Sequence, residues 1–143
     1  MTWLYNEVPF TRELAQEKID EGYIGFVYEI TDSLNGKKYI GKKLLSSTRK
    51  LAPLKGKTRK RKKCVQSDWE KYYGSSETVK ALVESRQSDF IRRIIYLCKS
   101  KGELSYMEAK EHFDREVLLT DDFYNEFIGV KIHSAHVKSL WKK

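Results

Sequence analysis

Two tyrosines and a glycine are the residues best suited to chemistry in this 143-residue sequence. Ten residues separate Tyr28 from Tyr39, and Gly41 follows Tyr39 after a single residue. Because side chains alternate along a strand, Tyr39 and Gly41 share one face, and Gly41 leaves bare backbone beside a phenol. A glycine within a strand often marks a close approach of a ligand or another chain. These residues predict the floor of an active site; the alternative is a hairpin whose tyrosines pack on a helix.

The segments that carry the tyrosines are typical of an antiparallel hairpin. Residues 25–31 are rich in aromatic and β-branched side chains, residues 32–36 supply turn chemistry that ends in Asn-Gly, and residues 37–42 resume alternation. We therefore expect strands at roughly 25–31 and 37–42.

Capping patterns and hydrophobic spacing predict the remaining elements. Helices are expected from about Thr11, over 67–74, over 75–86 and from Ser105, and a central strand over 90–97. The order predicts an α+β domain with a small three-stranded antiparallel sheet flanked by helices.

The length predicts one domain over residues 1–143. Within it we expect an N-terminal extension (1–22), a basic loop or arm (42–63) and a basic C-terminal tail (127–143).

The positive charge is concentrated directly after the hairpin. Residues 42–63 hold 11 of the 28 basic residues and no acid, which leaves 17 basic against 20 acidic residues, a net −3, elsewhere. Such a segment is typical of a polyanion-binding surface, and a solvated loop is the alternative. The nucleic-acid-binding candidates are Lys42, Lys43, Lys57, Arg59, Lys60, Arg61, Lys62 and Lys63.

The two cysteines and the apolar runs bear on the compartment. Cys64 and Cys98 lack CxxC spacing, which favours a reducing compartment, and Cys98 is expected in the core. No membrane helix or signal peptide is recognisable, so we expect a soluble cytoplasmic protein.

The hairpin motif resembles a known signature. Residues 26–28, Phe-Val-Tyr, and 39–41, Tyr-Ile-Gly, resemble the two halves of the GIY-YIG nuclease signature, with Phe26 where the signature has glycine. A third strand, a helix bearing Glu108 and the pair Tyr124-Asn125 then follow in the family's order. The resemblance spans about residues 23 to 126. Within the family, the chain resembles in particular the small stand-alone members found in bacteriophages, so the expected compartment is the host cytoplasm if the protein is phage-encoded.

The resemblance implies a metal-dependent endonuclease that hydrolyses phosphodiester bonds in DNA. Tyr39 would be the general base, Glu108 would hold one Mg²⁺ or Mn²⁺ ion, Tyr28 would orient the water or phosphate, and Asn125 would brace the site. Glu103 and Glu111 are alternative metal ligands. The presence of Glu108 also has a purely structural explanation, because it completes a capping box with Ser105.

Ionising a phenol with a pKa near 10 at pH 7 takes about 4 kcal/mol, which nearby cations must supply. Lys42 or Lys43, the catalytic arginine and the metal are the candidates for that task.

The arginine that the resemblance implies has two main candidates. Counting forward from Gly41 by the family's interval reaches Arg49, whereas counting backward from residues 75–76 reaches Arg61, with Arg59 beside it. An insertion between the two reference points explains the difference.

The family's histidine after this arginine has no counterpart between residues 42 and 111. Its role is then missing or falls to Lys43, Trp69 or Tyr72. The histidines present are expected at the surface rather than on zinc, because they lack matched cysteines; they are His112, His133 and His136.

The competing function is a non-catalytic nucleic-acid-binding protein that uses segment 42–63 and stacks bases on its tyrosines. The ordered set of two tyrosines, an arginine, Glu108 and Asn125 favours the enzyme. A single site of this kind nicks one strand, so double-strand cleavage would need a homodimer. No zinc finger or helix-turn-helix pattern accompanies the domain, so target choice falls to the domain, its arm or a dimer.

Overall fold

The computed structural model describes residues 2–56, 61–129 and 134–140, with the backbone alone at 49–51, 61–63, 136, 137 and 139. At its centre is a five-stranded sheet in the order β2-β1-β7-β3-β4. Its strands are β1 (Leu4–Tyr5), β2 (Val8–Pro9), β3 (Gly25–Asp32), β4 (Lys38–Leu44) and β7 (Phe90–Cys98).

The strands β4, β3 and β7 form the antiparallel part of the sheet, close to the predicted boundaries. The prediction of a three-stranded sheet was wrong, because β1 adds in parallel to β7 and β2 adds to β1. Each of the two added strands is two residues long, so neither shows an alternating pattern in the sequence. The fold class is α+β, with a mixed sheet.

Three α-helices begin at serine or threonine caps, which satisfy free backbone N–H groups of the first turn. They are α1 (Arg12–Asp20), α2 (Glu77–Arg86) and α3 (Lys101–Asp114), capped by Thr11, Ser76 and Ser100. The described chain also holds the short 3-10 helices η1 (Trp69–Lys71), η2 (Gln87–Asp89) and η3 (Ser134–Leu140).

Two predicted helix boundaries were wrong. Helix α3 begins four residues before Ser105, because the Ser100 hydroxyl accepts from the Glu103 N–H and the Glu103 carboxylate accepts from the Lys99 N–H. Glu108 therefore lies in the middle of α3. Residues 67–74 hold only η1, since the Asp68 side chain makes no capping hydrogen bond.

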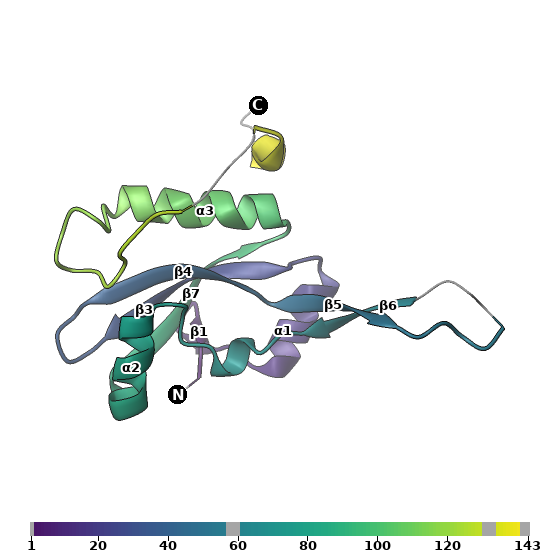
Figure 1. Ribbon diagram of the computed structural model, residues 1–143, viewed down its shortest axis with the longest axis horizontal. Coiled ribbons are helices and arrows are strands. Elements are labelled where there is room, and N and C mark those ends of the chain that lie inside the picture. The colour runs from purple at the N-terminus through teal and green to yellow at the C-terminus, as the bar shows by residue number, and fades with distance from the viewer. Residues whose placement is uncertain (1, 57–60, 130–133, 141–143) are drawn as a thin grey trace.

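The sheet separates two hydrophobic cores, with α3 on one face and α1 and α2 on the other (Figure 1). The aromatic core on the α1 and α2 face includes the fully buried Trp3, Phe26 and Trp69. The smaller core under α3 contains Ile40 and Cys98, the latter buried as predicted.

The basic segment, predicted as a loop or arm, contains regular strands. Residues 42–44 complete β4, and two further stretches pair as a second, two-stranded antiparallel sheet of β5 (Ser46–Leu51) and β6 (Arg61–Gln66). Backbone hydrogen bonds between β5 and β6 hold this second sheet together, and the charge composition of the segment does not reveal them. Figure 1 shows this hairpin extending along the long axis of the molecule, away from α2.

None of the helices in the described ranges is long and apolar enough to cross a membrane.

Candidate active site

The predicted floor of the site is a close stack of Tyr28, Gly41 and Gly74. Gly41 is the cross-strand partner of Tyr28, and a Cβ atom on Gly41 would lie 2.4 Å from the Tyr28 hydroxyl oxygen. Gly74 closes the stack, since its Cβ position lies 3.4 Å from that oxygen and 3.2 Å from the Tyr39 ring. Tyr28 is 1% exposed, so it forms the buried base of this stack and does not line a cavity.

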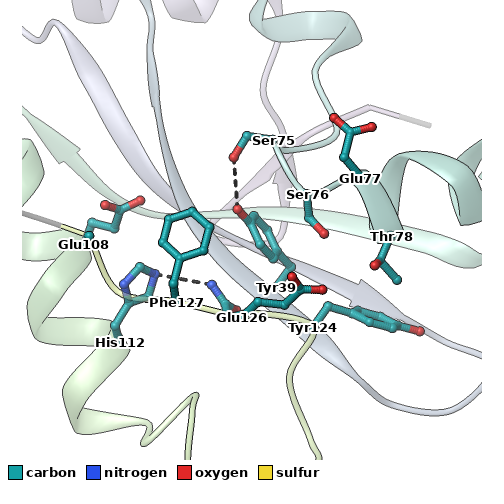
Figure 2. A pocket seen from close by; sticks show the side chains of 12 residues that line it. Tyr39, Ser75, Ser76, Glu77, Thr78, Glu108, His112, Tyr124, Glu126 and Phe127 are labelled. Atoms are coloured by element: carbon teal, nitrogen blue, oxygen red, sulfur yellow. Dashed lines mark hydrogen bonds between the residues drawn. The ribbon is translucent and has the colours of Figure 1, made fainter.

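Beside β4 lies a cavity of ≈250 Å³, which we call the Tyr39 cavity; Tyr28, Gly41 and Gly74 are not among its lining residues. It is bounded by β4, the N-terminal end of α2, the middle of α3 and residues 124–129. Figure 2 shows Glu108 and His112 on the α3 side and Glu77 and Thr78 on the α2 side. The lining residues are Tyr39, Ser75, Ser76, Glu77, Thr78, Glu108, His112, Tyr124, Asn125, Glu126, Phe127 and Gly129.

Asn125 and His112 hold β4 beside the cavity through Ile40. The Asn125 side chain accepts from the Ile40 N–H (3.0 Å) and donates to the Ile40 carbonyl (2.8 Å). His112 Nε2 lies 2.9 Å from the same carbonyl and must donate to it, because a carbonyl only accepts. These bonds fix the backbone next to Tyr39.

Glu108 is a partly buried carboxylate on the cavity wall. Burial raises its pKa, and the nearby His112 and Lys42 oppose that rise. Within the described ranges no lysine or arginine forms a salt bridge with it. Of the other two carboxylates considered, Glu103 serves the N-terminus of α3 and Glu111 bonds Arg115, and neither lines the cavity.

Tyr39 reaches the cavity with its hydroxyl 3.1 Å from Ser75 Oγ (Figure 2). Burial raises the pKa of the Tyr39 phenol, and the hydrogen bond with Ser75 partly opposes the rise. The pKa of Tyr28 is also raised, chiefly by burial. The protein groups alone therefore keep both phenols neutral.

Comparison with protein families places this geometry in a known group. The family model described as "Putative endonuclease segE, GIY-YIG domain" matches residues 3–128. The protein belongs to the GIY-YIG nuclease superfamily. At the level of the family, it is an endonuclease, a phosphodiester hydrolase. Comparisons with curated proteins and with solved structures returned no significant match.

The two lysines at the end of β4 of this GIY-YIG domain point to different partners. Lys42 Nζ donates to Ser105 Oγ at 2.8 Å. Lys43 Nζ forms an ion pair with Asp68 at 2.6 Å and lies 4.4 Å from the centre of the Tyr72 ring. Neither lysine lines the Tyr39 cavity.

The other two candidates for the role of the family's missing histidine, Tyr72 and Trp69, lie in the aromatic core on the α1 and α2 face. Tyr72 packs edge-on against Tyr28, with 5.9 Å between ring centres. Trp69 is buried and donates from its indole to Gln66 Oε1 at 3.0 Å. Tyr72 therefore supports Tyr28 from the α1 and α2 side, whereas Trp69 packs edge-on against Phe10 in the same core.

The candidate arginines lie on the hairpin of the GIY-YIG domain, where the structure describes their backbone alone. Arg49 is in β5 opposite Lys63, and Arg61 is in β6 opposite Leu51. Lys62 is also in β6, whereas Lys57, Arg59 and Lys60 lie outside the described residues.

The sequence interpretation missed two residues of this site. His112, expected at the surface, is 6% exposed and lines the cavity. Its spacing of four from Glu108 places the two on one helical face, a signal that was present in the sequence. Ser75 was considered only as a helix cap and as a reference point for counting to the arginine, and no local pattern predicts its contact with Tyr39. Of the other histidines, His133 and the His136 side chain lie outside the description.

Proposed function

We propose that this protein is a metal-dependent DNA endonuclease with Tyr39 as general base and Glu108 as ligand of a Mg²⁺ or Mn²⁺ ion. The observation that carries the proposal is the shared cavity. One cavity is lined by three residues that are distant in sequence, namely Tyr39 on β4, Glu108 on α3 and Asn125 after α3.

The residues present fit a divalent cation. Glu108 is partly buried, lacks a salt bridge among the described residues and faces a cavity with room for water. Mg²⁺ commonly takes one or two carboxylates and completes its shell with water and phosphate oxygens. Bound there, Mg²⁺ would supply Lewis-acid stabilisation of the leaving 3′ oxygen.

Tyr39 would take the proton from the attacking water. Since burial raises its pKa, more than the roughly 4 kcal/mol of an ordinary phenol must come from cations that join the site. Ser75 Oγ is placed to donate to the phenolate once it forms.

Asn125 and Tyr28 would act as positioning residues. Asn125 holds both backbone groups of Ile40 and thereby the strand position of Tyr39. Tyr28, buried below Gly41, would support Tyr39 from beneath rather than contact the water or phosphate directly.

The test is incubation of supercoiled plasmid with the protein in the presence of Mg²⁺, Mn²⁺ or EDTA. We expect nicking with either metal, none with EDTA, and none from Tyr39→Phe with DNA affinity retained. Salt-sensitive DNA binding without nicking under any metal would instead indicate the non-catalytic nucleic-acid-binding function.

A further inference from the structure

A second cavity, of ≈370 Å³, lies beside the last residues of β4 and the first turns of α3. We call it the lysine cavity; its lining is Lys42, Lys43, Leu44, Lys101, Leu104 and Ser105. Three of these six side chains are cationic and none is acidic. The Tyr39 cavity, in contrast, is lined by Glu77, Glu108 and Glu126.

Two ammonium groups of the lysine cavity are available to an anion. The Lys101 side chain is exposed, and no described residue pairs with its ammonium group. Lys42 donates one hydrogen bond to Ser105 Oγ, and an ammonium group has three donors. The charge of Lys43 is already engaged by Asp68 and Tyr72, so Lys43 contributes its aliphatic stem.

The two cavities follow one another along the same seam between β4 and α3. Residues 39–40 face Glu108 and His112, whereas residues 42–44 face Lys101 and Ser105. Lys101 and Glu108 are seven residues apart on α3, which is about 10 Å at 1.5 Å per residue. A DNA strand rises about 3.4 Å per nucleotide along the duplex axis, so an offset of this length spans at most about three nucleotide steps.

We infer that the lysine cavity binds a backbone phosphate of the substrate strand, within about three nucleotides of the cleaved bond, through Lys101 and Lys42. This inference rests on the proposed nuclease function and adds a substrate contact, with Lys101, outside the basic segment. The site positions DNA without reading its sequence, because phosphate contacts are the same for every base.

The first experiment measures DNA affinity without cleavage. The dissociation constant of a duplex oligonucleotide is determined in EDTA over a range of salt for wild type, Lys101→Ala, Lys101→Arg and Lys110→Ala. Lys110 is the matched control, because it lies on the same helix, outside both cavities, and pairs with Asp114. Loss of one phosphate contact lowers the log-log salt slope by about 0.9.

We expect that decrease for Lys101→Ala alone, with Lys101→Arg close to wild type. A slope for Lys101→Ala equal to that of Lys110→Ala would overturn the inference. This result is independent of nicking, so a failure of the proposed nuclease function is recognised separately, by the plasmid test.

The second experiment locates the phosphate. After the nick has been mapped, uncharged methylphosphonates replace single phosphates on either side of it. In wild type, one replacement within about three steps of the nick should weaken binding several-fold. In Lys101→Ala the same replacement should weaken binding less, because only Lys42 remains to contact that phosphate. Equal sensitivity of the two proteins at every position would refute the assignment.

Discussion

At the scale of single residues, Gly41 is restricted by the phenol beneath it. A Cβ atom would lie 2.4 Å from the Tyr28 hydroxyl oxygen and 2.6 Å from Cζ, and Tyr28 is too enclosed by Gly74 and Tyr72 to move aside. We predict that Gly41→Ala lowers the free energy of unfolding by about 1–3 kcal/mol, as overpacking does. Urea denaturation measures this change.

The matched control for Gly41→Ala is the double variant with Tyr28→Phe. Removing the hydroxyl oxygen relieves the closest contact and leaves Cζ, so the double variant should recover part of the loss relative to the sum of the single changes. Full additivity would show that the stack does not constrain Gly41.

Glu108 offers a second test at this scale. We predict that Glu108→Gln abolishes cutting and retains the fold and the DNA affinity, since glutamine preserves the shape and removes the charge that would hold the metal. In wild type, Mg²⁺ should raise the melting temperature, because a ligand that binds only the folded state stabilises it. If Mg²⁺ raises the melting temperature of Glu108→Gln equally, another group binds the ion.

At the scale of elements, a buried carboxylate on β3 connects two parts of the wall of the Tyr39 cavity. Asp32, at the end of β3, is fully buried and receives two hydrogen bonds from Arg86 of α2, at 2.9 and 2.7 Å. The Tyr124 hydroxyl donates to it at 2.7 Å. Because α2 and residues 124–129 both border the Tyr39 cavity, Asp32 fixes their separation.

These contacts lower the pKa of Asp32 to about 2, chiefly through Arg86. A carboxyl with a lowered pKa in the folded state contributes stability above its unfolded pKa of about 4, and that contribution, about 2 kcal/mol, is lost as pH falls from about 4 to 2. We predict that Asp32→Asn loses this stability at neutral pH and that its difference from wild type shrinks over the same interval.

Urea unfolding at several pH values measures this difference. Asp114→Asn is the control, since its pair with Lys110 is exposed and should contribute little to stability at any pH. A constant difference between Asp32→Asn and wild type from pH 7 to pH 2 would contradict the prediction.

The hairpin of β5 and β6 carries the two candidate arginines on opposite strands. We predict that one of Arg49→Ala and Arg61→Ala loses turnover with DNA affinity nearly retained, which identifies the catalytic arginine. Single-turnover cleavage rates and dissociation constants for both variants decide between them. Equal partial losses of affinity in both would mean that each merely contacts phosphate.

At the scale of the whole molecule, one cavity of the described chain contains both Tyr39 and Glu108. The basic hairpin extends beyond the end of β4 along the long axis (Figure 1). We predict that nicked circles precede linear plasmid at low protein concentration, since one site cleaves one strand per engagement. A time course on supercoiled plasmid measures the order of products. Linear plasmid as the first product, with a rate that rises with the square of protein concentration, would indicate a dimer.

Much of the fold was predictable because its signals are local. Alternation and Asn-Gly turn chemistry located β3 and β4, and the apolar run located β7. The start of α3 was misplaced because two serines five residues apart, Ser100 and Ser105, each begin a capping-box pattern. The β5 and β6 hairpin was missed because its sequence was interpreted from its charge, and charge gives no indication of which strands pair.

By itself the sequence determined the tyrosine hairpin, the helix that bears Glu108 and the concentration of positive charge after β4, since all three are properties of contiguous segments. Only the tertiary structure decided that Glu108 rather than Glu103 or Glu111 faces Tyr39, and that His112 is buried against Ile40. It also placed Lys101 beside Lys42 in a second cavity. These outcomes depend on how α3 packs along β4, and contacts between residues distant in sequence leave no periodic trace within either segment.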